Sequence, residues 1–134
     1  MNAPSVDVKD ILEADSSLGL VFGTNLFISK TPITPVDVDV CAVIYDTPGW
    51  PPQLTLTPGE NYYYPSIQIM VRANHYIEGW DLINDIKVSL HGHSHETWNG
   101  TLYTVIRCTS EPALLNWDEK NRAQFVVNFD LQRR

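Results

Sequence analysis

Basic residues are scarce in this sequence. Nine Lys and Arg residues stand against 16 Asp and Glu residues, which gives a formal net charge of −7 over 134 residues. A protein that binds nucleic acid needs a surplus of Lys and Arg to neutralise phosphates, and adhesion to an anionic membrane needs the same surplus. The composition therefore argues against both kinds of binding. It leaves open a protein past which DNA moves without being specifically bound.

Long apolar runs are absent as well. No stretch approaches the roughly 20 apolar residues that a membrane-spanning helix requires, so we expect no membrane partner. The first residues, MNAPSVDVKDILEAD, are acidic and lack the basic and then apolar layout of a signal peptide. The sequence thus predicts a soluble protein that is cytoplasmic when it is made.

Cysteine is rare, and its spacing suggests no pairing. Cys41 and Cys108 form no C-x-x-C motif, and both lie in apolar, strand-like runs. Free cysteines of cytosolic proteins are commonly buried and reduced. We therefore expect two buried thiols rather than a disulfide or a redox pair.

The common catalytic motifs are missing too. The chain contains no G-x-S-x-G, no G-x-G-x-x-G and no Walker-type Gly-Lys-Ser/Thr segment. Glu78, Asp81 and Asp85 lie mostly off the apolar stripe of a predicted helix, which indicates a solvated acidic face. The sequence predicts no cofactor and a protein that is not an enzyme.

One segment nevertheless suggests chemistry, the sequence HGHSHET at 91–97. His91, His93 and His95 could point one way from an extended strand, about 6.6 Å apart given the strand rise. Zinc ligands lie about 2 Å from the ion, so all three could bind only if the strand bends. The histidine-triad nucleotide hydrolases need hydrophobic residues between and after their histidines, and this segment has none at those positions.

Local patterns offer another explanation of these histidines. Gly92 favours the left-handed backbone that ends many helices, which makes His91 the last residue of a helix. His95 leads into a predicted hairpin at Asn99-Gly100. We interpret the segment as a solvated connection or surface contact, and keep a metal site formed by the three histidines as the weaker alternative.

The length and composition fit one folded domain. Chains of 134 residues commonly form a single domain, and contents of 43% hydrophobic and 19% charged residues are ordinary for a globular protein. We expect one domain over residues 1–134.

Two helices are predicted from apolar periodicity. Ser5 opens the first helix, which ends before Gly19, and Val8, Ile11 and Leu12 form its apolar stripe. The second helix starts at Asn74 as the capping residue and runs to about Leu90. Its apolar stripe consists of Tyr76, Trp80, Ile83, Ile86 and Leu90. Gly79 lies on the same stripe, where a neighbouring backbone could approach closely.

Alternating or continuous apolar runs predict the strands. These runs are Leu26–Ser29, Val40–Tyr45, Pro65–Ala73, His95–Trp98, Thr101–Arg107 and Ala123–Gln132. A turn is expected at Thr31–Pro35 and a polar loop around Trp117. The fold class is α+β, a mainly antiparallel sheet of four to six strands packed by one long helix and a shorter N-terminal helix.

The segment from Asp46 to Tyr64 is rich in proline and aromatic residues. A loop of this length in a compact domain is usually functional or disordered, and its aromatics argue against disorder. We expect an ordered arm at about 46–64, with the aromatics serving either a protein interface or this domain's own core. The candidate interface residues of the chain are Trp50, Tyr62, Tyr63, Tyr64, Arg133 and Arg134. The last two end a strand that could pair with a neighbour if it lies at a sheet edge.

Several segments in order resemble a known family. They are GTNLFISK (23–30), DTPGWPP (46–52), YPSIQIMVRA (64–73), SLHG (89–92), WNGTLY (98–103) and RAQFVVNFDLQRR (122–134). Together they resemble the minor capsid proteins of tailed bacteriophages that are related to tail-terminator and tail-completion proteins. The resemblance extends over nearly the whole chain.

The resemblance implies a structural role and a tail-terminator-like fold. Proteins of this kind form a ring, typically a hexamer, that caps the tail tube and offers a docking surface to the head connector or neck protein. We would then expect the protein at the head–tail junction of a virion, and in the host cytoplasm during assembly. Two alternatives remain, a small metal-dependent enzyme that uses the histidines at 91–95 and a phage-encoded module that binds a protein partner.

Overall fold

The computed structural model describes residues 1–30, 38–59 and 61–134. Within these residues the chain forms two helices and seven strands. The helices are α1 (Pro4–Ala14) and α2 (Tyr76–Leu90), and the strands are β1 (Leu26–Ile28), β2 (Cys41–Gln53), β3 (Tyr62–Ala73), β4 (Ser94–Trp98), β5 (Thr101–Cys108), β6 (Ala113–Trp117) and β7 (Ala123–Arg133). The predicted turn at Thr31–Pro35 lies outside the described residues.

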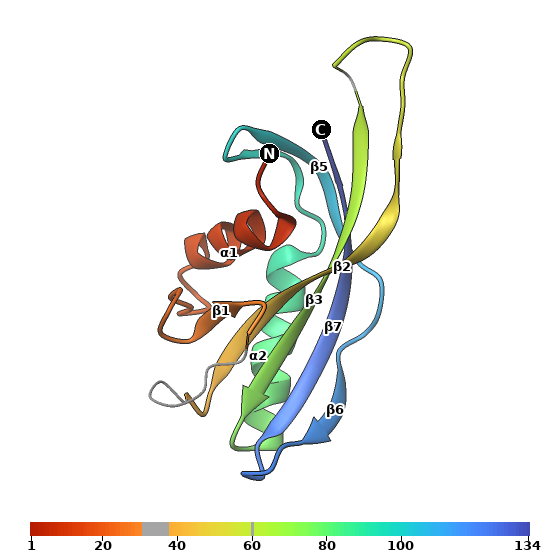
Figure 1. The fold of residues 1–134 in the computed structure, drawn as a ribbon. Helices are drawn as coiled ribbons and strands as arrows, with labels where there is room; N and C mark the ends of the chain where they lie inside the picture. Colours follow the sequence, from red (N-terminus) through yellow and green to blue (C-terminus); the bar gives the residue numbers. More distant parts are fainter. Residues whose placement is uncertain (31–37, 60) are drawn as a thin grey trace.

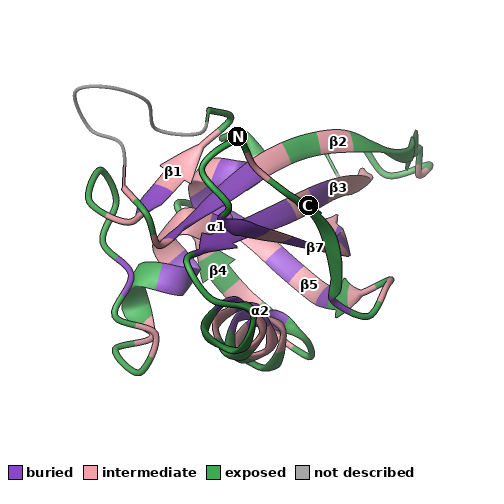
Figure 2. Ribbon diagram, turned by 90° about the horizontal axis from the view of Figure 1, so that it is seen from below, coloured by how far each residue is buried: buried purple, intermediate pink, exposed green. Residues whose placement is uncertain are grey.

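All seven strands belong to one sheet. The strand order is β1-β2-β3-β7-β5-β4, and β6 pairs with β7 beside this path. The β1–β2 pair is parallel, whereas the other pairs are antiparallel. The sheet curls into a half-barrel, and both helices lie on one face of it (Figures 1 and 2). The α+β class and the mainly antiparallel pairing are confirmed, but the expected four to six strands are corrected to seven, in a curled sheet whose β1–β2 pair is parallel.

The central strand is β7. Its residues alternate between buried and half-buried along its whole length, as predicted, with Phe125, Val127, Phe129 and Leu131 on the buried face. It pairs with β3 along one side and with β6 and then β5 along the other. Both sides of the C-terminal strand are therefore paired within this chain, so this strand is not available to pair with a neighbouring chain.

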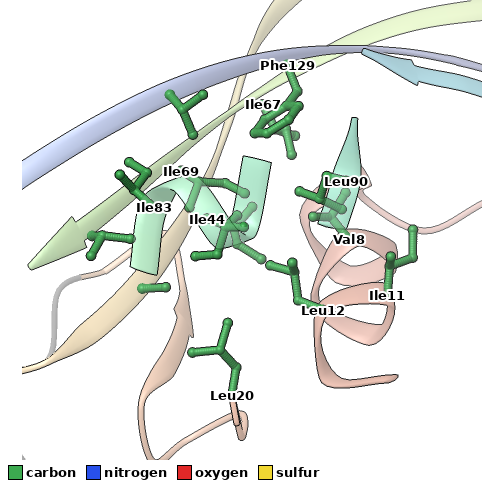
Figure 3. Packing of buried hydrophobic residues seen from close by; sticks show 14 of the residues in the cluster. Val8, Ile11, Leu12, Leu20, Ile44, Ile67, Ile69, Ile83, Leu90 and Phe129 are labelled. Atoms are coloured by element: carbon green, nitrogen blue, oxygen red, sulfur yellow. The ribbon is translucent and has the colours of Figure 1, made fainter. Parts of the chain in front are cut away.

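The core lies between the sheet and the two helices. Figure 3 shows side chains from α1 and α2 converging on side chains of β2, β3 and β7. The fully or almost fully buried members include Val8, Ile11, Leu12, Ile44, Ile67, Ile69, Ile83, Leu90 and Phe129. The apolar stripes predicted for both helices thus face the same core, although Tyr76 of the second stripe is largely exposed.

A bulge in β5 changes the predicted alternation of that strand. Tyr103 pairs with Arg133 and Val105 pairs with Gln132, so one extra residue lies on the β5 side. An extra residue reverses the side on which the following side chains point. Tyr103 and Ile106 consequently both enter the core, whereas simple alternation places them on opposite faces.

Other local predictions meet mixed outcomes. The Asn99-Gly100 hairpin is confirmed, since both residues have positive φ and join β4 to β5. The first turn of α2 has His75 rather than Asn74 in the capping position, without a side-chain cap. The segment around Trp117 forms strand β6 instead of a loop.

The cysteine prediction is confirmed for Cys41, which is buried, whereas Cys108 is half-buried. Within the described part of the chain neither cysteine forms a disulfide. Among the described residues, no helix combines the length and the apolar character needed to cross a membrane.

Gly79 marks a tight contact between α2 and β7. A Cβ added at this position would lie 2.6 Å from Cε2 of Phe125 and 3.3 Å from the Cβ of Ala73. The close neighbours are therefore side chains and not the backbone that the sequence suggested. Both neighbours are fully buried, so neither can move away without disturbing the core.

Replacing Gly79 by Ala should therefore destabilise the protein despite the better helix propensity of alanine. Propensity favours alanine by about 1 kcal/mol, whereas overpacking of a core costs about 1–3 kcal/mol. Chemical denaturation would measure the free energy of unfolding. Phe125→Leu should relieve the clash, so that the double variant loses less than the sum of the two single variants. A stabilised G79A protein would contradict this account of the contact.

Candidate functional site

The segment 46–64, called the arm below, projects from the body of the molecule (Figure 1). It was expected to be a long loop, but most of it continues β2 and β3 as a hairpin. Trp50 pairs with Tyr64 and Gln53 with Tyr62, and the Tyr64 hydroxyl donates a hydrogen bond to Oε1 of Gln53 at 2.7 Å. The prolines made this part of β2 unpredictable from the sequence, because proline usually interrupts a sheet.

Two successive bulges shape the arm. Between Thr47 and Trp50, and again between Trp50 and Gln53, β2 advances by three residues while β3 advances by two. Each bulge adds one residue, which bends and twists a strand and re-aims its side chains. Bulges also accommodate prolines, which explains how β2 continues through this proline-rich stretch.

Gly49 allows the two strands of the arm to approach. A Cβ at this position would lie 2.0 Å from the carbonyl oxygen of Tyr64 and 2.9 Å from Pro65. These neighbours are backbone atoms and cannot rotate away as a side chain could. The geometry of the arm therefore requires glycine here.

The arm carries exposed apolar side chains and almost no charge. Trp50 is 73% exposed, Leu54 is 80% exposed and Leu56 is fully exposed. Among the described arm residues only Asp46, at the base, is charged. Apolar and aromatic surface with little charge is typical of the centre of a protein interface.

Trp50 stands between two hollows at the base of the arm. One hollow, of about 190 Å³, is also lined by Tyr64, Val105 and Arg107. The other, of about 300 Å³, is also lined by Pro4, Tyr63 and Arg133. Trp50 thus borders both hollows, which a partner's side chains could fill.

The base of the arm is bonded to helix α1. The carboxylate of Asp46 accepts the backbone N–H of Ser5 at 2.9 Å and the hydroxyl of Ser5 at 2.7 Å. A carboxylate at a helix N-terminus pairs with unsatisfied N–H groups and with the positive end of the helix dipole. Ser5 was expected to cap the helix, whereas it lies inside the first turn and Asp46 of β2 supplies the acceptor.

A second carboxylate, that of Asp7 in α1 itself, attaches the helix to the sheet. Asp7 is fully buried and accepts hydrogen bonds from the Tyr103 hydroxyl and, at 2.7 Å, from the Asn99 amide. Arg133 lies 3.8 Å from this carboxylate and donates to the carbonyl oxygen of Asn2 at 2.8 Å. Burial and the hydrogen bond to Asp7 raise the pKa of the Tyr103 hydroxyl. The cluster ties the start of α1 to β5, β7 and the β4–β5 turn.

The candidate interface residues fall into different environments. Trp50 is exposed, and the three tyrosines Tyr62, Tyr63 and Tyr64 are half-buried. Arg133 is only 8% exposed because it serves the cluster around Asp7. Arg134 is exposed, and its guanidinium lies 5.7 Å from the centre of the Tyr62 ring. The arm and Arg134 are therefore accessible to a partner, whereas the side chain of Arg133 is buried by contacts within its own chain.

The three histidines do not point to a common centre. The ring nitrogen Nδ1 of His91 accepts the backbone N–H of Cys108 at 2.9 Å, while Nδ1 of His93 lies 2.8 Å from Oε2 of Glu96. His95 is exposed and has a positive φ of 55°. Hydrogen bonds from the Trp98 indole and from His93 lower the pKa of Glu96. Within the described ranges, no group of three or more His, Cys, Asp or Glu side chains is placed to hold a metal ion.

Sequence reasoning missed the residues that position the arm. Asp7 and Asp46 are bonded to groups far away in the chain, and no local motif connects them. The only signal at Asp7 was its position near the start of a helix, where the dipole favours an acid. Gly49 was visible only as one turn-forming residue among prolines.

Solved structures of low sequence identity share this fold. A chain of the "Virion of native gene transfer agent (GTA) particle" matches with a TM-score of 0.66 at 11% identity, covering 98% of this chain and 94% of that chain. A second solved chain, whose name states no function, matches with a TM-score of 0.54 at 11% identity, covering 96% and 90%. Such low identity supports the fold alone. No curated protein matches the sequence significantly.

The shared fold places the protein among curled-sheet α+β domains, a class that includes a virion component. The sequence defines the family more closely, because the family model described as "Bacteriophage tail terminator protein" matches residues 14–134. The chain belongs to the bacteriophage tail terminator family, and the resemblance noted in the sequence is confirmed. As a member of this family, it is a structural virion protein of the tail end that interacts with other virion proteins.

Replacing Asp7 by Ala should destabilise the fold strongly. The change leaves the buried Arg133 without its carboxylate, and removing one partner of a buried ion pair costs about 3–5 kcal/mol. Urea denaturation would measure the loss. The control Asp85→Ala, on the exposed face of α2, should change the unfolding free energy by less than about 0.5 kcal/mol. Equal effects of the two variants would contradict the role given to Asp7.

Replacing Gly49 by Ala should displace the arm and leave the core folded. The added methyl group meets the Tyr64 backbone, so the strands of the arm must separate, at a cost of about 1–3 kcal/mol. Hydrogen exchange should become faster for arm amides and stay unchanged in the middle of β7. Thr47→Ala, a change in the same strand that adds no atoms, is the control. Unchanged exchange in the G49A arm would show that glycine is not required there.

Proposed function

We propose that the protein forms a ring, a hexamer in the simplest case, at the head-proximal end of a phage tail. The ring terminates the tail tube and joins it to the head connector or neck protein. Membership of the tail terminator family supports the position at the tail. The ring itself is what the sequence resemblance implies for proteins of this kind.

The observation that supports this proposal is the exposed apolar surface of the arm. A free subunit holds Trp50, Leu54 and Leu56 in water, although apolar exposure of this kind normally marks an interaction surface. The bulges, Gly49 and the bond between Asp46 and Ser5 hold the arm in one direction. A projecting, preorganised element with little charge is suited to reach a neighbouring subunit in an assembly.

The charge distribution suits a ring through which DNA moves. Glu78, Asp81 and Asp85 are exposed on α2, in a chain whose net charge is −7. Acidic surface repels phosphates, whereas a basic lumen would bind the duplex and slow it. The proposed ring therefore lets DNA pass without specific binding.

The proposed role requires neither catalysis nor a cofactor. His91 and His93 are hydrogen-bonded to different elements, so the metal-dependent enzyme considered from the sequence gains no support from their placement. Residues 91–93 instead link α2 to the β4–β5 hairpin, and His95 lies within β4.

The proposal can be tested by complementing a phage that lacks this gene. Leu54→Ser with Leu56→Ser removes apolar surface from the arm and should leave tails uncapped and separate from heads, as counted by electron microscopy. Val88→Ser removes a comparably exposed apolar side chain from α2 and serves as the matched control. Circular dichroism would verify that both proteins fold. Normal-length tails joined to heads in the complete absence of the protein would refute the proposed function.

A further inference from the structure

A second exposed apolar surface lies at the start of α2 and along β6. Its residues are Tyr76, Trp80, Leu114 and Trp117, which we call the acceptor patch. The rings of Tyr76 and Trp80 meet the Phe125 ring edge-on, with centroid distances of 5.2 and 6.3 Å. Tyr76 is 46% exposed and Trp117 is 49% exposed.

The strand register shows that these side chains share one face. Leu114 lies opposite Phe125 and Trp117 lies opposite Ala123 in the β6–β7 pair. Directly opposed residues of an antiparallel pair point to the same side of the sheet. Leu114 and Trp117 therefore point to the side of the sheet on which α2 packs, and Leu114 pairs with Phe125, whose ring contacts Tyr76 and Trp80.

The outer side of β6 adds an open strand edge to this patch. In the described part of the chain β6 pairs with β7 alone, and all five of its residues, ALLNW, are exposed and uncharged. Other free edges are protected in known ways. Strand β1 has only three residues, β4 contains the positive-φ His95, and the arm portion of β2 carries three prolines.

The acceptor patch and the arm occupy opposite ends of the molecule (Figure 1). A chain therefore cannot cover its patch with its own arm. Two different surfaces that meet between identical subunits form a heterologous contact, which repeats around a closed ring when the rotation closes. The two ends of this molecule provide such a pair of surfaces.

Charge favours the arm as the occupant over most of the remaining surface. The patch is flanked by Glu78 in sequence after Tyr76, and by Asp118 and Glu119 after Trp117. A second copy also carries a net charge of −7, so an acidic part of its surface would be repelled by Glu78 and Glu119 at short range. The arm residues Thr47–Gly59 contain no charge and can approach without that cost.

We propose that the arm of one copy docks on the acceptor patch of the next copy. Trp50, Leu54 and Leu56 then pack against Tyr76, Leu114 and Trp117, and the contact repeats around the ring. This inference rests on the proposed ring and specifies the two surfaces that form it. Contacts centred on Trp and Tyr side chains commonly dominate interface energies.

The test uses opposite charges placed on the two surfaces of the full-length protein. Leu56→Lys on the arm and Leu114→Glu on the patch should each reduce the fraction of tails that carry a ring at least about tenfold. The double variant L56K/L114E should regain much of that fraction, because a Lys–Glu pair replaces the apolar contact. The double variant L56E/L114E should not recover. Val21→Glu, at an exposed apolar site outside both surfaces, is the control.

These variants separate docking of the arm on the patch from a general loss of folding. Leu114 is already 37% exposed, so Glu is tolerated there, and Leu114→Ser provides a milder variant if thermal unfolding shows a loss of stability. Normal rings with L114E, or no rescue by L56K/L114E, would overturn the docking of the arm on the patch while leaving the ring intact as a proposal. Rings that form with L114E but fail to attach to tails would assign the patch to the tail-tube protein instead. Failure of the unaltered protein to form rings on tails would refute the proposed function itself.

Discussion

The pairing of β7 with β3 is the constraint on which the remaining structure depends. Nine residue pairs connect the two strands, from Tyr63–Arg133 to Ala73–Ala123, and their buried faces form the floor of the core. A slip by one residue would turn Phe125, Val127 and Phe129 out of that core. Because β5 and β6 also pair with β7, such a slip would displace the rest of the sheet as well.

Strand β3 transmits this fixed register to the arm. The same strand that holds Ile67, Ile69 and Val71 in the core continues beyond the body of the molecule as one side of the hairpin. The arm can therefore be bent by bulges and still start from a fixed point. Asp46 adds a second attachment through α1, so the direction of the arm depends on the packing of the whole domain.

Local patterns predict the elements whose neighbours repeat regularly. The alternation in β7, the apolar stripe of α2 and the Asn99-Gly100 turn each follow from adjacent residues, and the structure contains all three. Strand β6 was not predicted, because an edge strand exposed on both faces shows no alternation of apolar and polar residues. The hairpin of the arm was not predicted, because bulges allow β2 to continue through prolines. The contacts of Arg133 within the chain could not be predicted, because its partners, Asp7 and Asn2, are remote in sequence.

The cluster around Asp7 also imposes an order on folding. Arg133 bonds to Asn2 across 131 positions, and Tyr103 bonds to Asp7 across 96. Contacts of such separation form late, since the intervening chain must first be ordered. The contacts of Asp7 with Tyr103 and Arg133 therefore form only after β5 and β7 have been synthesised and paired. The same first turn of α1 holds Ser5 against Asp46, so the support of the arm is complete only when strands made last in the chain have fixed this turn from the other side.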